Sequence, residues 1–308
     1  MKLNNDIIIL YHAYGSIALH HQVMFSLLTL HYFLEGLYNN IQVVVYTDKP
    51  EYYSQFEGQM PIGFELLTPE LLAAYKGQDQ FVHRVKVCII KDCFEKYNKN
   101  ILYLDSDTYF TEDPLPLLNC IDDTTSIMNS NDYDLNNADE LYENLDWLLI
   151  RRAIRDYEYK VEGRYTKIPL DTRMWNAGVI GLSCKNKNLV DKVLDLTDQI
   201  YKNKKVFTAE QFAFSFYLQN HTKMLTSGNV IFHYWPNFIG KYWKNMYSYH
   251  FKHFFNQYKK EGLKVKAAKA MELTKQHDEL MQPAKKTRWQ RIYRRIKLAG
   301  VIILKGKI

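Results

Sequence analysis

The stretch Ile101-Leu-Tyr-Leu-Asp105-Ser-Asp107-Thr-Tyr-Phe110 decides the fold, because an apolar run ends abruptly in two aspartates one residue apart. The run is short, apolar and aromatic, which predicts a buried strand. Residues i and i+2 share one face of a strand, so two carboxylates in mid-strand would be buried together at a large cost. At the carboxyl end of a strand, the pair instead suits a divalent cation that also binds substrate phosphates. Residues 112–116 predict a loop that leaves the strand, which favours this site. The alternative is a plain turn, since Asp favours turns.

Length and composition indicate a globular chain with a large core. The 308 residues predict one large domain with appendages, or two domains, and 47% of them are hydrophobic. The four cysteines have no zinc-type C-x-x-C spacing, so we expect reduced core thiols. Residues 6–11 are too short for a signal peptide's apolar region, and no stretch has the length of a transmembrane helix.

Charge is distributed unevenly along the chain. Residues 241–308 hold 18 Lys/Arg and 4 Asp/Glu, a balance of +14, whereas the whole chain carries +6 and the first 240 residues therefore −8. A basic tail on an acidic body predicts that the tail meets an anionic surface. Nucleic acid is a poorer partner, because the acidic body would repel a duplex.

Strand and helix patterns alternate along the chain. Apolar runs predict strands at 7–10, 41–46, 101–104, 178–182 and 230–233. Apolar stripes predict helices at 18–34, 82–97, 188–203 and 208–219, and residues 130–160 suggest an inserted helical segment. This alternation predicts an α/β fold with a mixed, mainly parallel sheet flanked by helices. Such sheets bind ligands at the carboxyl ends of their strands, where the aspartates lie.

Several motifs occur in an order that resembles one enzyme family. They are a first strand ending in Tyr11, a helix starting His83-Arg84-Val85-Lys86, the Asp105-Ser106-Asp107 turn, Trp175-Asn176-Ala177-Gly178, Thr208-Ala209-Glu210-Gln211, and a late His233. The ordered set resembles the GT-A glycosyltransferases, and most of all the retaining family 8, over roughly residues 5–243. The resemblance implies a Rossmann-like catalytic domain over 1–243. It also implies a hexosyltransferase that uses a nucleotide-diphosphate sugar, usually a UDP-sugar.

The resemblance assigns a metal site to Asp105, Asp107 and His233. These residues would bind Mn²⁺ or Mg²⁺, which bridges the two phosphates of the donor. Mixed oxygen and imidazole ligands suit Mn²⁺ better than Ca²⁺. In Ile231-Phe232-His233-Tyr234-Trp235, however, the histidine could equally be a hydrogen-bonded core residue.

Two cations at a helix start are candidates for donor binding. The family places an arginine at the position that Arg84 matches, and a guanidinium suits phosphate and hydroxyl oxygens. Cations at a helix start oppose the macrodipole, which favours a function for Arg84 over a solvated helix start. Lys86 is the weaker candidate, since its side chain could simply face solvent.

The segments around residues 176 and 210 would surround the transferred sugar. In the family, Asn176-Ala177-Gly178 lines the donor-sugar pocket, while the alternative is an Asn turn before a strand. Glu210-Gln211 matches an Asp-Gln pair of the family, with Glu replacing Asp, and an inverting enzyme would use Glu210 as general base. Thr208 and Gln211 also fit a helix capping box, and both readings can hold together.

Other candidates are carried over by position. Tyr11 and Ala13 correspond to the nucleotide-base pocket, where a tyrosine could stack on uracil, and Ser106 lies between the two aspartates. Thr47 and Asp48 are weaker candidates at the end of the second strand. Lys241 is a candidate for diphosphate binding, although Gly240 and Lys241 stand at unusual spacings from His233.

The C-terminal region 244–308 predicts membrane association. Apolar residues at 289, 292, 293, 296 and 299 form one helical stripe, with arginines mostly off it, as in interfacial amphipathic helices. A packed surface helix or an oligomer contact is the alternative. We expect a peripheral protein on the cytoplasmic face of a bacterial plasma membrane, acting on a glycan, lipid-linked or lipopolysaccharide-type acceptor, with residues 130–160 near the acceptor.

Two other classes are considered. A sugar-phosphate nucleotidyltransferase would share a related sheet, but its glycine-rich basic loop is replaced here by Tyr11-His-Ala-Tyr-Gly15. A membrane-associated nucleotide-sugar binder without catalysis would bind UDP but release no sugar. The sequence selects neither the sugar, the acceptor nor the oligomeric state.

Overall fold

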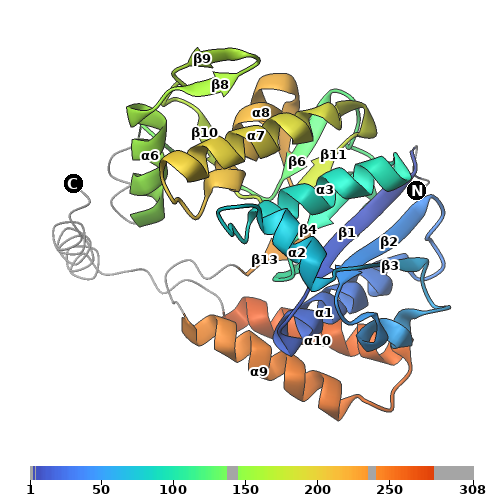
Figure 1. The fold of residues 1–308 in the computed structure, drawn as a ribbon. Helices are drawn as coiled ribbons and strands as arrows, with labels where there is room; N and C mark the ends of the chain where they lie inside the picture. The colour runs from blue at the N-terminus through green and yellow to red at the C-terminus, as the bar shows by residue number, and fades with distance from the viewer. Residues whose placement is uncertain (1–2, 4, 137–144, 235–240, 281–308) are drawn as a thin grey trace.

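The computed structural model describes residues 3, 5–136, 145–234 and 241–280, and side chains there except at 241–248 and 277–280. A seven-stranded sheet lies between two layers of helices (Figure 1). Across the sheet the strands are β12 (Lys223–Thr226), β6 (Thr125–Met128), β11 (Val179–Leu182), β4 (Asn100–Leu104), β1 (Ile7–Ala13), β2 (Ile41–Thr47) and β3 (Ile62–Leu66). Within this sheet β11 alone is antiparallel to its neighbours. The predicted mixed, mainly parallel α/β sheet is therefore confirmed.

The helices cover both faces of the sheet. One layer contains α2 (Pro69–Lys76), α3 (Arg84–Tyr97), α6 (Leu145–Asp156), α7 (Asn188–Asn203) and α8 (Ala209–His221). The other contains α1 (Ile17–Leu34), α4 (Leu115–Leu118), α9 (Lys241–Gln257) and α10 (Leu263–Leu280). Each layer has its own hydrophobic core, and the sheet separates the two.

Strand β1 shows how the sequence feeds both cores. Ile8 and Leu10 pack into the core below α3, whereas Ile9 and Tyr11 pack into the core below α1. Successive side chains of a strand point to opposite faces, so a strand buried on both sides is apolar throughout. His12 is the first strongly polar residue of β1, and it lies near the end of the strand at the ligand-binding edge.

A sharp turn leads from α3 into β4. Asn98, which ends α3, adopts the left-handed conformation with φ 50° and ψ 41°, and its N–H bonds the Phe94 carbonyl. Asn tolerates this conformation better than most residues, which makes it a common helix terminator. The chain therefore enters β4 at Asn100 and reaches the sheet edge at Asp105.

Short strands outside the main sheet shape its ligand-binding edge. They are the pairs β5 (Thr108–Phe110) with β13 (Ile231–His233), β7 (Asn131–Asp134) with β10 (Arg173–Trp175), and β8 (Tyr159–Val161) with β9 (Arg164–Thr166). Two 3₁₀ helices span Pro50–Phe56 and Cys184–Asn186. The segment 130–160, expected to be an inserted helical segment, contains strand β7 and helix α6 in the part that the structure describes.

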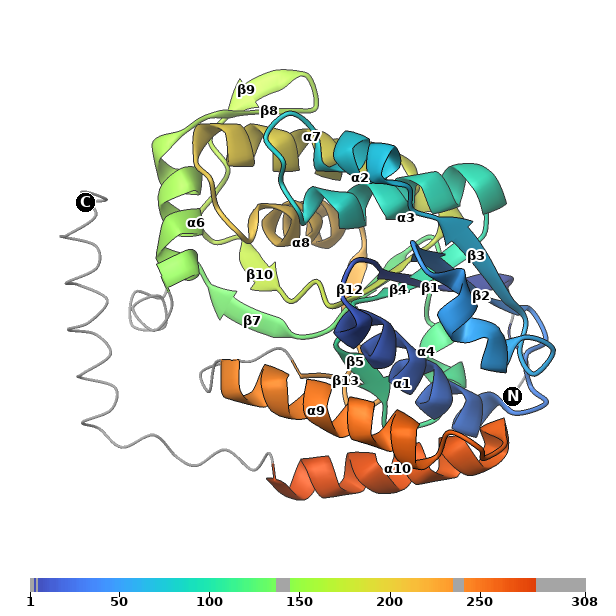
Figure 2. The ribbon, with the colours of Figure 1, turned by 60° about the horizontal axis from the view of Figure 1, so that its bottom comes forward.

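Helices α9 and α10 lie against α1 (Figure 2). The rings of Phe25 and Phe251 stack with centroids 4.2 Å apart, and Lys266 Nζ donates to Gln55 Oε1 at 2.8 Å. The domain division expected at residue 243 falls within α9, and the basic stripe beyond residue 286 lies outside the described residues. In the described part of the chain, no helix combines the length and the apolar composition needed to cross a bilayer.

Candidate functional site

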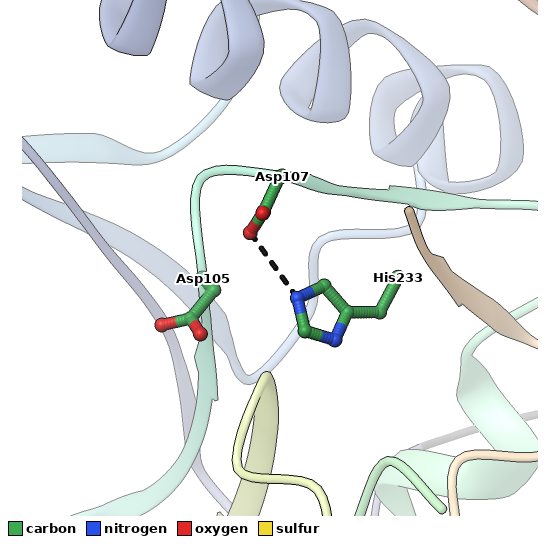
Figure 3. A group of neighbouring side chains, drawn as sticks. All are labelled: Asp105, Asp107 and His233. Atoms are coloured by element: carbon green, nitrogen blue, oxygen red, sulfur yellow. Dashed lines mark hydrogen bonds and ion pairs between the residues drawn. The ribbon is translucent and has the colours of Figure 1, made fainter. Parts of the chain in front are cut away.

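Three side chains that could bind a metal meet at the carboxyl edge of the sheet (Figure 3). Asp105 follows β4, Asp107 precedes β5, and His233 ends β13. Strand β13 pairs with β5, and the N–H of Tyr234 bonds the Asp107 carbonyl at 3.1 Å, so the pairing carries His233 to the aspartates. One ligand atom from each residue lies within 4.8 Å of the other two. The structure thus brings together all three predicted ligands from segments 126 residues apart.

The chemistry of this cluster fits a divalent cation. Asp107 Oδ1 lies 3.2 Å from His233 Nε2, and the aspartate charge raises the pKa of His233 although burial acts to lower it. Burial acts to raise the pKa of Asp105, but the charges of Lys86 and His233 and a hydrogen bond from Tyr103 lower it to about 2. Asp105 is therefore ionised at neutral pH. Two carboxylates and one imidazole are suitable ligands for Mn²⁺, and Mg²⁺ accepts the carboxylates.

Lys86 is the cation of this site. It is 5% exposed, and its Nζ lies 3.0 Å from Asp105 Oδ2, 3.0 Å from the Ala177 carbonyl and 3.5 Å from Glu210 Oε1. Although burial acts to lower the pKa of Lys86, the two carboxylates raise it above its usual value. The expectation that Lys86 could face solvent is wrong, because the helix turns this side chain onto the sheet edge.

Arg84 lies on another side of the same helix. Its guanidinium binds Asp198 through Nε at 2.7 Å and Nη2 at 3.1 Å, and Nη1 donates to the Tyr75 carbonyl at 2.8 Å. A helix rotates by about 100° per residue, so positions 84 and 86 point in widely different directions. Arg84 ties α3 to α2 and α7, and it does not line the pocket that contains Lys86.

Tyr11 is not placed to stack on a nucleobase. Its side chain is fully buried in the core below α1, and its hydroxyl forms a 2.9 Å hydrogen bond with Ser26 Oγ. The alternation of β1 presents the next residue, His12, to the site instead. His12 Nδ1 lies 2.9 Å from the Tyr103 hydroxyl, which donates to Asp105 Oδ1 at 2.6 Å. Burial lowers the pKa of His12 to about 4, and Tyr14 stacks on its ring.

The segment 176–178 lines the same pocket as Lys86 and His233, and Gly178 has a steric reason to be glycine. A Cβ at Gly178 would lie 2.3 Å from both Cε1 and Nδ1 of His233. We expected the small residues of this segment to let its backbone approach a ligand closely. In the described structure, the group that Gly178 approaches closely is the ring of His233. Asn176 Oδ1 accepts the Gly178 N–H at 2.9 Å and faces His233 Nδ1 at 2.9 Å.

Glu210 and Gln211 lie in the first turn of α8 and both line the pocket. Glu210 is 4% exposed, and its Oε2 atom has no hydrogen-bond partner among the described residues. The capping box is not formed, because Thr208 makes no side-chain cap bond and Gln211 Nε2 points to Asp132 Oδ2 at 3.3 Å. Gln211 therefore serves the pocket rather than the end of its helix.

Sequence reasoning missed Asp132 of β7. Its Oδ1 accepts from Ser130 Oγ at 2.9 Å, and its Oδ2 accepts from the amides of Asn176 and Gln211, both at 3.3 Å. Burial raises its pKa above the usual aspartate value. The signal in the sequence that could have indicated Asp132 was the polar run 129–134. This run contains strand β7 but lacks the alternation of apolar and polar residues by which a strand is usually recognised.

The pocket around these groups contains about 640 Å³ of space free of atoms, part of it open to solvent. The pocket is also lined by residues that the sequence analysis did not assign to the site: His83, Asp146, Trp147 and Phe207. The rings of His83 and Phe207 meet edge to face at 4.0 Å, and Trp147 stacks on Tyr133 at 4.0 Å. Aromatic side chains together with a few placed polar groups are typical of pockets that bind small molecules.

The remaining predicted residues lie as follows. Ser106 Oγ donates to Gln22 Oε1 at 3.1 Å, and Ala13 is buried at the end of β1. Asp48 Oδ2 accepts the N–H of Gly15 at 3.0 Å and so shapes the loop after β1. Lys241 begins α9, but its side chain lies outside the described residues.

Comparisons with known proteins give weak structural likenesses. No protein-family model and no curated protein sequence matches the chain. Among solved structures, the apo form of the glycosyltransferase GlyE from Streptococcus pneumoniae TIGR4 is similar, with a TM-score of 0.48 and 14% identity over 85% of this chain and 64% of GlyE. An active-site mutant of LgtC is similar with a TM-score of 0.46 and 14% identity, over 71% of this chain and 73% of LgtC. The chain spans less than two thirds of GlyE, and likenesses this weak assign it to no family.

Proposed function

We propose that the protein is a metal-dependent glycosyltransferase that moves a hexose from a nucleotide-diphosphate sugar, such as a UDP-sugar, to a glycan or glycolipid. The observation that carries the proposal is the convergence of Asp105, Asp107 and His233 beside the buried Lys86, at the edge where parallel sheets bind ligands. The order of motifs, which resembles glycosyltransferase family 8, supports it further. Mn²⁺ or Mg²⁺ held by the three ligands would stabilise the charge of the departing diphosphate.

The protein's own groups would position the reactants. Lys86 holds Asp105 in place and keeps it ionised, because its ammonium group lies 3.0 Å from one carboxylate oxygen and Tyr103 bonds the other. Glu210 lines the pocket, and its Oε1 atom lies 3.5 Å from Lys86 Nζ, so its carboxylate adds negative charge beside the candidate metal ligands. Gln211 and Asp132 add further hydrogen-bonding groups on the same side. The site therefore orients a polyhydroxylated substrate next to the charged cluster.

Retention of the anomeric configuration is part of the proposal and rests on the resemblance to the retaining family. Inversion is the second candidate, and the place of Glu210 in the wall of the pocket favours it, because an inverting enzyme needs a carboxylate to accept the acceptor proton. The anomeric configuration of the product, followed by NMR during the reaction, decides between the two. A β-configured product from an α-configured donor would establish inversion.

The first experiment is a donor screen. Release of nucleoside diphosphate from a panel of UDP-sugars, with Mn²⁺ and with EDTA, should reveal metal-dependent turnover. Asp107→Asn should abolish it, while Asp6→Asn, an exposed carboxylate at the start of β1, should not. UDP binding without any sugar release would instead favour a non-catalytic binder, and full activity of Asp107→Asn would rule out the metal role.

We further propose that the C-terminal region binds an anionic membrane, on the cytoplasmic face of a bacterial plasma membrane. Its support is the +14 balance of residues 241–308, of which the described part exposes the lysines Lys252, Lys259, Lys260, Lys264 and Lys275. Each basic residue near an anionic surface contributes about 1 kcal/mol. Replacing Arg291, Arg294 and Arg295 by Gln should weaken binding to anionic vesicles, with neutral vesicles as control. Unchanged binding would contradict the proposal.

A further inference from the structure

A second pocket opens next to the candidate site, on the other side of the start of α3. We call it the α2–α7 pocket, because residues 76–79, Phe81 and Arg84 line one side of it and residues from the stretch 198–202 of α7 line the other. It contains about 850 Å³ of space free of atoms, part of it open to solvent. The two pockets are neighbours that share no lining residue, because His83 lines the candidate site and the next residue, Arg84, lines the α2–α7 pocket.

A row of four aromatic rings runs from one pocket to the other. The ring centroids of Tyr201 and Phe81 are 3.9 Å apart, and those of Phe81 and His83 are 5.6 Å apart. His83 meets Phe207 at 4.0 Å, and Phe207 is 43% exposed. Tyr201 lines the α2–α7 pocket, whereas His83 and Phe207 line the candidate site. The connection from α2 to α3 and the segment from α7 to α8 therefore form one continuous wall along both pockets.

Contacts between the two segments hold this wall in place. Arg84 binds Asp198 through Nε at 2.7 Å and Nη2 at 3.1 Å. Lys205 forms an ion pair with Asp79, and its Nζ lies 4.6 Å from the centre of the Tyr201 ring. The pocket is thus preformed, which lowers the cost of ordering side chains when a ligand binds.

The linings of the two pockets fit a sugar chain better than a lipid. Among the described residues that line them there is no Leu, Ile, Val or Met, so an acyl chain would find little aliphatic surface to bury against. Both pockets instead combine aromatic rings with amide and charged side chains, which in the α2–α7 pocket include Lys76, Gln78 and Lys202. A pyranose ring presents C–H groups that pack on aromatic rings and hydroxyl groups that bond to polar side chains.

We propose that the α2–α7 pocket is a distal subsite for the acceptor, so that the acceptor is an oligosaccharide whose chain runs from the candidate site along the aromatic row into this pocket. The inference rests on the proposed function, which places the reacting end of the acceptor beside the candidate metal ligands. Sugar units remote from the reacting end add binding energy that a single sugar cannot supply. Affinity should therefore rise with the number of sugar units until the chain occupies both pockets.

The test is a chain-length series measured by binding to the full-length protein. Cello-, malto-, galacto- and manno-oligosaccharides of one to six units are titrated and followed by saturation-transfer NMR, with Mg²⁺ and UDP and without either. At least one series should bind, with an affinity that rises by about tenfold or more from the monosaccharide to the longest chain. Absence of binding in every series, or equal affinity for all lengths, would overturn the inference.

Variants of the pocket and of the row separate the two contributions. Gln78→Ala combined with Lys202→Ala removes two exposed polar side chains of the α2–α7 pocket. This double variant should lower the affinity for the longest chains about tenfold and leave mono- and disaccharides unchanged. Phe207→Ala should weaken the binding of chains of every length, because Phe207 lines the candidate site. The control is Lys259→Ala combined with Lys260→Ala, two exposed lysines between α9 and α10, which should bind every chain as the wild type does.

The double variant at positions 78 and 202 can also contradict the proposal. Unchanged affinity for long chains, or an equal loss for chains of every length, would overturn it. Absence of both turnover and UDP binding in the donor screen would instead refute the proposed function. A length-dependent series that the double variant abolishes would still establish the α2–α7 pocket as an oligosaccharide site, because the binding measurement needs no transfer.

Discussion

Replacing Lys86 by Met tests the electrostatics on which the site depends. Met keeps the apolar stem and removes a buried ammonium group that lies 3.0 Å from Asp105 Oδ2 and 3.5 Å from Glu210 Oε1. At an effective dielectric constant near 20, each contact is worth about 5 kcal/mol of Coulomb attraction, which the desolvation of the lysine largely offsets. The variant leaves the buried Glu210 and the partly buried Asp105 without their cation, so we expect it to lower the free energy of unfolding by about 3–5 kcal/mol.

The assay is urea unfolding followed by circular dichroism at pH 7 with EDTA present. Lys91→Met is the matched control, because Lys91 lies on the same helix, pairs with Asp191 and Glu95, and is 38% exposed. A surface pair of this kind contributes about 0–1 kcal/mol. The difference between the two variants therefore measures the effect of burial rather than the loss of a lysine from α3.

The pH dependence supplies a second check with a definite sign. Lys86 helps to lower the pKa of Asp105 to about 2, below its usual 3.8. A carboxylate whose pKa is lower in the folded than in the unfolded protein stabilises the fold at any pH above its unfolded-state pKa. This stabilisation is lost as the pH falls through its folded-state pKa. The difference in free energy of unfolding between the wild type and Lys86→Met should therefore shrink as the pH falls below about 4. If Lys86→Met lowered the free energy of unfolding at pH 7 by less than about 1 kcal/mol, as expected for Lys91→Met, the reasoning would be refuted.

Three further predictions concern other residues in and around the site. Gly178→Ala should displace His233, lower the free energy of unfolding by about 1–3 kcal/mol and weaken Mn²⁺ binding. Gly63→Ala is the control, because its Cβ would meet only a side-chain nitrogen at 3.8 Å, and it should change neither quantity. Equal stability and equal Mn²⁺ affinity of the two variants, measured by calorimetry, would contradict this prediction. Because burial lowers the pKa of His12 to about 4, protonation of this residue should destabilise the folded protein as the pH falls. Between pH 7 and pH 4 the free energy of unfolding of the wild type should therefore fall by up to about 3 kcal/mol more than that of His12→Phe. The same pH dependence of stability in both proteins would refute this prediction. Arg84→Met should destabilise the protein but leave the KM for the donor sugar unchanged, and a tenfold higher KM would place Arg84 in the donor site.

The strands and helices were largely predictable, because their signals are local. Apolar runs and stripes located β1, β2, β4, β11, α1, α3, α7 and α8 within a few residues of their observed bounds. The alternation of strands and helices also predicted the mainly parallel sheet and the edge at which the aspartates lie. The segment 130–160 was harder, since the polar strand β7 is stabilised by pairing with β10, which lies about 40 residues further along the chain.

Side-chain direction was predicted less well than position. The motif match favours Arg84 over Lys86 and points to Tyr11, whereas Lys86 and His12 are the side chains that reach the site. Neighbouring strand residues point to opposite faces, and helix residues two apart diverge by about 200°. An error of one or two positions in a motif match therefore changes which side chain reaches the site, even when the segment is identified correctly.

By itself, the sequence determined the class of fold and the two aspartates at the end of a buried strand, because apolar periodicity and a sudden carboxylate pair are local properties of the chain. The tertiary structure alone decided that His233 joins them, that Lys86 is their buried cation, and that Asp132 holds Asn176 against the histidine. These contacts join residues that are 19 to 126 positions apart. Only the pairing of β5 with β13 and of β7 with β10, together with the packing of α3 on the sheet, brings them within hydrogen-bonding distance.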